Sequence, residues 1–277
     1  MKSPLCIAAG IGYPIDTVDE IGKIADVGFD GFFTGCSKDN SEKFAAIARE
    51  KGLIYQSMHA PFGRANRMWE TGAEGDDVEA ELCSCLDLCS DCGVGILVAH
   101  VFIGFEDHSP NEIGAERFFR VGQHAAKAGV ELALENTEGE EYLACAMDAT
   151  KGNSFVGFCL DTGHEMCYNR SQDMLALYGD RVIATHFNDN QGITGEKITW
   201  LDDAHLLPFD GIADWENVVS RLDAHNYTGA YTFELTIHNK PERHTHDIYR
   251  DWTIEKYLSE AYQRAVRIRS MSKICGE

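Results

Sequence analysis

The sequence has 277 residues, with 24 Lys and Arg against 45 Asp and Glu, so its formal net charge is −21. This charge argues against a broad nucleic-acid surface, because phosphate binding depends on Lys and Arg, and against an anionic membrane surface. The apolar runs are far shorter than the roughly 20 residues that span a bilayer, and the first residues lack a signal-peptide profile. Hydrophobic residues make up 44% of the chain, enough for a packed core, so we expect a folded cytoplasmic protein.

Along the chain, short apolar runs that predict strands alternate with amphipathic runs that predict helices. The expected strands are Leu5–Ala9, Gly31–Phe33, Ile54–Met58, Gly95–His100, Glu131–Glu135, Phe155–Leu160, Val182–Phe187 and Ala230–Leu235. The expected helices are Thr17–Val27, Ser41–Lys51, Val78–Asp91, Asn111–Ala128, Glu141–Ala149, Ser171–Leu177, Trp215–His225 and a last one from about Asp247 to Arg269. Glycines such as Gly28, Gly52 and Gly93 follow several of these helices, as is typical of helix ends.

Most of the expected strands are continuous apolar runs rather than alternating ones, which indicates burial on both faces and a parallel sheet. Eight such strands with helices between them predict an α/β fold of the (β/α)8 TIM-barrel type, with residues 1–277 as one domain. A doubly wound open sheet is the alternative, although no Gly-x-Gly-x-x-Gly turn follows a strand. The segment Gly192–Asp214 has the longest stretch without regular periodicity, and we expect it to be a functional loop.

The ten cysteines do not indicate a disulfide framework, because such frameworks belong to short secreted chains. Cys83, Cys85, Cys89 and Cys92 are close in sequence and could suggest a thiolate site. Three of them, Cys85, Cys89 and Cys92, instead follow the spacing of one helix face among leucines. We therefore expect them to pack in the core as small apolar side chains.

Ionisable residues gather at the ends of the expected strands, which is the face where TIM barrels build active sites. Nine of them are His59, His100, Glu135, Asp161, His164, His186, Asp203, His205 and Glu234, and Asp189 also follows a strand end. Carboxylates and imidazoles so close together are costly unless a cation neutralises them, and they are ligands of Zn²⁺ and Mn²⁺. The remaining histidines are expected to be mostly solvated: His108, His124, His225, His238, His244 and His246.

The strand ends also carry motifs by which the sequence resembles the xylose-isomerase-like barrel superfamily, over nearly its whole length. The motifs are Leu134-Glu135-Asn136-Thr137-Glu138-Gly139, Cys159-Leu160-Asp161-Thr162-Gly163-His164, His186-Phe187-Asn188-Asp189, the run from Asp203 to Trp215, and Phe233-Glu234-Leu235. This superfamily joins sugar (phosphate) isomerases and epimerases to metal-dependent AP endonucleases. The resemblance is carried by the motifs together, in this order, rather than by any one of them.

The resemblance implies a role for each matching position. In the epimerase branch Glu135, Asp161, His186 and Glu234 would hold one divalent metal (Zn, Mn or Mg), with Glu135 and Glu234 as the proton-transferring pair. The candidate substrate-binding residues are His59, His100, His164 and His205. In the endonuclease branch a cluster of ions would take further ligands from His59, His100, His164, Asp203 and His205.

The net charge favours the isomerase branch, because a nuclease must hold a polyanion. The stretch Leu207–Trp215 also looks more like the isomerase pattern, although Gly192 stands where a known epimerase has Arg. We therefore expect a divalent-metal-dependent isomerase or epimerase of a small sugar, acting through an enediolate. An AP endonuclease-like phosphodiesterase, a sugar-acid dehydratase and a non-catalytic barrel are the alternatives. Phosphorylation of the substrate, for which Lys197, Lys240 and Arg243 are candidate contacts, and a homo-oligomeric state stay open.

Overall fold

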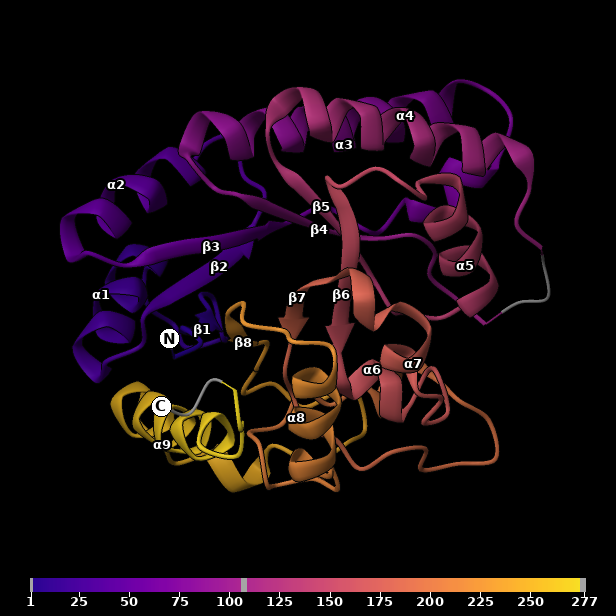
Figure 1. Ribbon diagram of the computed structural model, residues 1–277. Coiled ribbons are helices and arrows are strands. Elements are labelled where there is room, and N and C mark those ends of the chain that lie inside the picture. Colours follow the sequence, from indigo (N-terminus) through magenta and orange to yellow (C-terminus); the bar gives the residue numbers. More distant parts are fainter. Residues whose placement is uncertain (1, 106–108, 275–277) are drawn as a thin grey trace.

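The structure, a computed structural model, describes residues 2–105 and 109–274, and its strands form a ring surrounded by helices (Figure 1). The strands are β1 (Leu5–Ala8), β2 (Gly31–Gly35), β3 (Ile54–His59), β4 (Ile96–His100), β5 (Glu131–Glu135), β6 (Val156–Asp161), β7 (Val182–His186) and β8 (Tyr231–Phe233). The helices are α1 (Thr17–Val27), α2 (Ser41–Lys51), α3 (Ala73–Cys92), α4 (Glu112–Ala128), α5 (Glu140–Ala149), α6 (Thr162–Met166), α7 (Met174–Tyr178), α8 (Trp215–Ala224) and α9 (Ile254–Arg269).

Each strand pairs in parallel with its neighbours in the order β7-β6-β5-β4-β3-β2-β1-β8. The ring closes between β7 and β8, where the Phe187 amide donates to the Thr232 carbonyl (2.7 Å) and the Glu234 amide donates to the Phe187 carbonyl (3.1 Å). The predicted (β/α)8 barrel is therefore confirmed, and the open doubly wound sheet is wrong.

The observed helices differ from those expected chiefly at the start of α3, at the start of α9 and in the additional helix α6. Helix α3 begins at Ala73 rather than Val78, because buried Arg117 of α4 binds the Gly72 carbonyl (3.3 Å) and the Asp76 carboxylate (2.8 Å) at its start. Helix α9 begins at Ile254, since Thr253 caps it and residues 247–249 form a separate 3-10 turn. Helix α6 was not predicted, because its five residues are too few to show a helical period.

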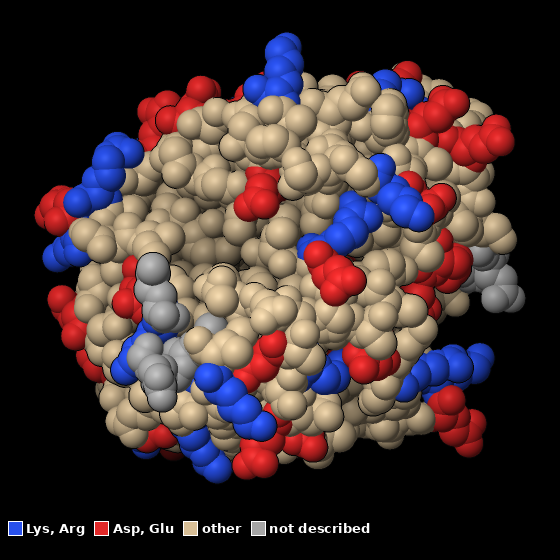
Figure 2. Space-filling model, viewed as in Figure 1, with Lys and Arg blue, Asp and Glu red and all other residues tan. Residues whose placement is uncertain are grey.

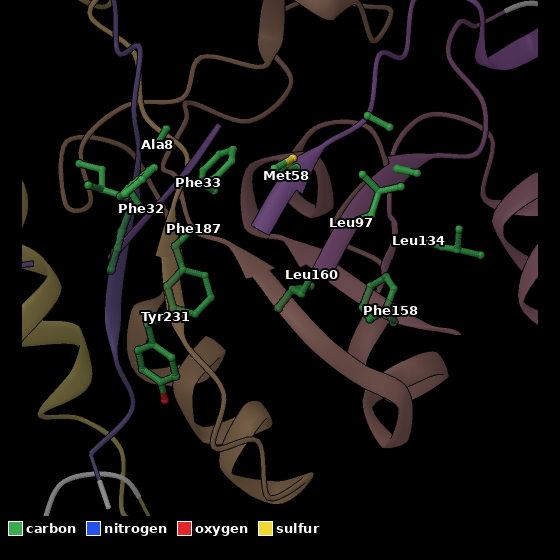
Figure 3. Packing of buried hydrophobic residues seen from close by; sticks show 14 of the residues in the cluster. Ala8, Phe32, Phe33, Met58, Leu97, Leu134, Phe158, Leu160, Phe187 and Tyr231 are labelled. Atoms are coloured by element: carbon green, nitrogen blue, oxygen red, sulfur yellow. The ribbon is translucent and has the colours of Figure 1, made fainter. Parts of the chain in front are cut away.

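The hydrophobic core lies mainly between the barrel and its helices (Figure 3). Leu97, Leu134 and Phe158 come from three successive strands, while Phe187 and Tyr231 pack with ring centroids 5.2 Å apart near the β7–β8 junction. A second, smaller cluster inside the barrel consists of the small residues Val98, Ala133, Cys159 and Ala184. These small side chains form the apolar layer below the strand ends.

The cysteines of α3 behave as expected from their spacing. Cys85, Cys89 and Cys92 are buried in the core, and the nine cysteines in the described part of the chain are free. Burial raises the pKa of Cys83 to about 11, so its thiol stays protonated near neutral pH.

Within residues 2–105 and 109–274, no helix combines the length and the hydrophobicity needed to cross a membrane.

Candidate metal centre at the mouth of the barrel

The two-residue period of the strands places four ionisable side chains on the inside of the barrel. His100, Glu135, Asp161 and His186 end β4 to β7, each two residues after a member of the small interior cluster. Register pairs His100 with Glu135 and Asp161 with His186. The apolar layer inside the barrel therefore lies directly below these four side chains.

Eight of the nine predicted residues fall into three groups, two of which share Glu135 and His186, and within each group the ligand atoms lie within 4.8 Å of one another. The groups are Glu135, Asp161, His186 and Glu234; His59, Glu135 and His186; and His164, Asp203 and His205. The ninth, His100, places its Nε2 3.1 Å from Glu135 Oε2. The structure thus brings all nine residues together at one mouth.

Glu135 lies at the centre of the cluster and is fully buried. Its carboxylate is 2.9 Å from His186 Nδ1 and 3.2 Å from His59 Nε2. Burial alone would raise the pKa of Glu135, but the charge of His186 and hydrogen bonds from His100, His186 and His59 hold it well below the usual range. The carboxylate is therefore kept ionised by the imidazoles around it.

Three histidines are oriented by backbone carbonyls. His59 Nδ1 donates to the Ala60 carbonyl (2.7 Å), His164 Nδ1 to the Asn136 carbonyl (2.8 Å), and His205 Nδ1 to the Glu234 carbonyl (3.0 Å). This arrangement fixes the tautomer and leaves each Nε2 facing the cluster, which is how proteins present histidine to a metal. The three fixed rings thus direct Nε2 toward the mouth, where it can bind a metal once its proton is lost.

Asp161 is held by amides that the sequence analysis did not single out. The Asn188 side chain donates to Oδ2 (2.8 Å), and the His164 backbone amide donates to Oδ1 (2.7 Å). Gly163 makes room for this contact, because a Cβ there would lie 1.9 Å from Asn188 Oδ1. Asn188 and Gly163 both lie within the strand-end motifs, and those motifs are the sequence signal that could have identified them. Burial, with the nearby negative charge of Glu135, raises the pKa of Asp161 to about 7.

The loop after β7 contributes Asp203 and His205. His205 Nε2 lies 2.8 Å from Asp203 Oδ2, and His205 itself has a positive φ of 55°. Such a backbone conformation is uncommon for non-glycine residues and is concentrated at functional sites. Burial opposes the charged form of His205, but the Asp203 carboxylate raises its pKa to about 9.

Asp189 was grouped with the strand-end residues, but it faces the loop instead of the mouth. It accepts hydrogen bonds from the amides of Phe209 (2.8 Å) and Ala213 (2.9 Å) and from the Trp215 indole (3.2 Å). Its role is therefore to fold residues 206–215 over the end of β7.

The expectation for the other histidines is partly wrong. His246 is buried beneath the Asp203–His205 loop, and burial lowers its pKa to about 4. His124 and His225 are half-buried and paired with Asp87 (2.7 Å) and Asp180 (2.9 Å). His238 and His244 are exposed as predicted, while His108 lies outside the described residues.

A buried, unpartnered carboxylate oxygen tests whether the cluster fits a cation. In the described part of the chain, Asp203 Oδ1 is buried without a hydrogen-bond partner. Leaving such atoms unpaired is costly, and so is gathering four carboxylates in a buried site. Nitrogen and carboxylate donors suit Zn²⁺ or Mn²⁺. The residues therefore fit a divalent metal, with Glu135, Asp161, His186 and Glu234 as its holders.

A cavity of about 640 Å³ opens above the cluster. Its described lining includes His59, His100, His164, Asp203, His205 and Glu234, together with Phe62, Tyr168, Trp200 and Lys240. Glu234 is thus at the cavity wall, whereas Glu135 is absent from that lining and lies one layer deeper. The arrangement combines a charged floor with aromatic walls and has room for a small polar molecule.

Comparison with known proteins places this fold in a family. The family described as xylose isomerase-like TIM barrel matches residues 21–254. The chain belongs to this family. The resemblance inferred from the strand-end motifs is therefore confirmed.

A curated protein from Sinorhizobium fredii (strain NBRC 101917 / NGR234), the uncharacterized protein y4fM, is 33% identical over 162 residues. The match covers 54% of this xylose isomerase-like chain and 50% of that protein, so the chain spans about half the length of its curated relative. This relative supplies no activity to compare.

Solved structures share the fold at low identity. A xylose isomerase-like TIM barrel/4-hydroxyphenylpyruvate dioxygenase fusion protein has a TM-score of 0.78 at 14% identity, covering 99% of this chain and 44% of that one. D-Psicose 3-epimerase from Clostridium cellulolyticum H10, solved with D-tagatose, has a TM-score of 0.70 at 15% identity, covering 97% and 99%. Likeness at this level shows the fold alone.

Proposed function

We propose that this xylose isomerase-like barrel is a divalent-metal-dependent isomerase or epimerase of a small sugar or sugar phosphate. Glu135 and Glu234 would transfer a proton through an enediolate. The proposal is carried by the convergence of the two glutamates on one ring nitrogen: His186 Nδ1 is 2.9 Å from Glu135 and 3.2 Å from Glu234. The shared fold with D-psicose 3-epimerase, a sugar epimerase by name, supports the same reaction class.

The two glutamates have the positions and charges that this chemistry needs. A divalent ion held by Glu135, Asp161, His186 and Glu234 would supply Lewis-acid polarisation of the substrate carbonyl. Glu234 is at the cavity wall and can receive a proton from a substrate carbon. Burial opposes its ionisation, but the charge of His186 holds the pKa of Glu234 at about 2, so the carboxylate is ionised.

The histidines of the cavity wall would hold the sugar. His59, His100, His164 and His205 all line the cavity, and we propose that they bind substrate hydroxyl groups or, where further ions bind, serve as additional ligands. Asp203 joins the additional ligands, since it forms one group with His164 and His205.

Solvent-deuterium exchange tests the proposal. Metal-replete protein is incubated in D₂O with a panel of ketoses, ketose phosphates and related hydroxy acids, and hydrogen exchange next to the carbonyl is followed by NMR. We expect exchange on at least one substrate, and a loss of about 10²–10⁴ in kcat for Glu135→Gln and Glu234→Gln. Exposed Glu216→Gln on α8 is the matched control and should retain full activity. Turnover without deuterium incorporation would contradict the glutamate pair, and the absence of both exchange and turnover on every member would contradict the isomerase.

A second candidate is metal-dependent hydrolysis of a phosphodiester. The specific observation in its favour is that the donors form three groups, more than one ion requires. Glu135 and His186 belong to two of these groups, and divalent ions held there would supply Lewis-acid stabilisation of a phosphate. The net charge of −21 disfavours a nucleic-acid substrate for such a site.

A further inference from the structure

Three basic residues occur in the loops after β7 and β8, where TIM barrels frequently bind phosphate groups. The structure separates them. Arg243 pairs with buried Asp202 (3.4 Å), and Lys197 lines a neighbouring cavity of about 760 Å³. Lys240 lines the 640 Å³ cavity that contains Glu234, His164 and His205, and it is the only Lys or Arg among the described residues of that lining.

Lys240 is held at the cavity wall from two sides. Its Nζ lies 3.6 Å from Asp203 Oδ2 and 5.5 Å from the centroid of the Trp200 ring. Its side chain is 23% exposed, so its stem is mostly packed while the ammonium group borders the cavity. These contacts restrict a long side chain that is otherwise costly to order.

The charge around Lys240 depends on the metal centre. Asp203 Oδ2 is also close to His205 Nε2 (2.8 Å) and His164 Nε2 (3.5 Å), so its charge is shared with the proposed ligand group. Asp203 is the only carboxylate that pairs with Lys240 among the described residues. A cation held by Asp203, His164 and His205 would draw on that same negative charge and leave the ammonium group of Lys240 available to an anion in the cavity.

We propose that Lys240 binds an anionic group of the substrate, a phosphate ester or a carboxylate. This inference rests on the proposed function, because it assigns the substrate class of the same site: sugar phosphates or sugar acids, in preference to neutral sugars. An ammonium group recognises either anion as a point charge with rotatable donors, and charge-assisted hydrogen bonds are about twice as strong as neutral ones.

Equilibrium binding tests the inference without turnover. Calorimetric titration of metal-replete protein uses inorganic phosphate, D-gluconate and D-fructose as probes, the first two distinguishing phosphate from carboxylate recognition. We expect Lys240→Met to weaken binding of the preferred anion by about tenfold or more. Lys240→Arg should restore most of the affinity, and D-fructose binding should not change. Lys197→Met, in the neighbouring cavity, is the matched control and should bind the anion like the wild type.

Kinetics with matched substrates separates this inference from the proposed function. Lys240→Met should raise KM for D-fructose 6-phosphate or a sugar acid while leaving kcat nearly unchanged. Unchanged anion affinity in Lys240→Met, or an equal loss for D-fructose, would overturn the role of Lys240. If anion binding depends on Lys240 but no substrate exchanges with solvent, the anion site stands and the isomerase proposal fails. If a neutral ketose exchanges at full rate in both the wild type and Lys240→Met, and neither anion binds to the wild-type protein, the isomerase proposal stands and the anion site fails.

Discussion

At the scale of single residues, the candidate metal centre includes neutral side chains as well as ionisable ones. Asp161 receives hydrogen bonds from the Asn188 amide and from the His164 backbone, and Asn136 bonds to the Asp161 backbone on both sides, accepting from N (2.7 Å) and donating to O (2.9 Å). Partners of this kind orient a ligand and set its basicity. The Asp161 carboxylate at the end of β6 is therefore oriented by neighbouring amide groups.

Replacing Asn188 tests the role of these amide groups. Asn188→Ala should weaken binding of Zn²⁺ or Mn²⁺ by about 10–100-fold, because Asp161 loses a hydrogen bond that orients it. Asp161→Asn removes a proposed ligand and should abolish most of the bound metal. Both are measured by elemental analysis of protein purified without chelator and by competition with a chromogenic chelator. Exposed Asn217→Ala on α8 is the control, and metal content equal to wild type in Asp161→Asn would argue against this centre.

At the scale of elements, the loop between β7 and α8 supplies part of the candidate site. It carries Asp203 and His205, and its C-terminal half is folded by the buried carboxylate of Asp189. Gly211 fits against this carboxylate, because a Cβ there would lie 2.2 Å from Asp189 Oδ1. The loop is thus an ordered part of the fold with its own internal hydrogen bonds.

Removing Asp189 should destabilise the protein and disturb the site together. Asp189→Ala leaves the amides of Phe209 and Ala213 and the Trp215 indole without their acceptor, and we expect a loss of about 1–3 kcal/mol in the free energy of unfolding. Urea unfolding followed by circular dichroism measures the loss. Glu216→Ala, exposed at the start of α8, should change stability by about 0.5 kcal/mol or less. Equal stability of the two variants would show that Asp189 does not hold the loop.

At the scale of the whole molecule, charge limits the partners of the site. On the face in Figure 2, Lys and Arg stand singly or in small groups, many of them beside Asp or Glu, and they form no continuous basic surface. This distribution agrees with the net charge of −21 and with a small substrate that enters a cavity.

The acidic surface predicts that the protein neither binds nor cleaves DNA. Zinc-loaded protein should leave a fluorescent duplex containing an abasic site intact and should not shift it in a gel at physiological salt, because too few Lys and Arg contact phosphates. A known abasic-site endonuclease serves as positive control. Cleavage that disappears in Glu135→Gln would favour the phosphodiesterase over the isomerase.

The sequence by itself determined the barrel and the place of the site. Eight apolar runs buried on both faces require a parallel sheet covered by helices, and the two-residue period carries the acids and histidines at the strand ends to one mouth. The short helix α6 and the early start of α3 could not be predicted in this way. Local pattern decides neither, since α6 has five residues and α3 is fixed at its start by Arg117 from another helix.

Only the tertiary structure decided which polar residues face the cluster and which do not. In sequence, Asp189 resembled the site residues and His246 resembled the solvated histidines. In the structure, Asp189 folds residues 206–215, and His246 is buried beneath the Asp203–His205 loop. The sequence did not distinguish the three loop cations Lys197, Lys240 and Arg243. In the structure, Lys240 lies at the cavity beside Asp203, whereas Arg243 pairs with Asp202. The physical reason is that periodicity acts only within regular elements, whereas a loop side chain takes its direction from contacts with residues far away in the sequence.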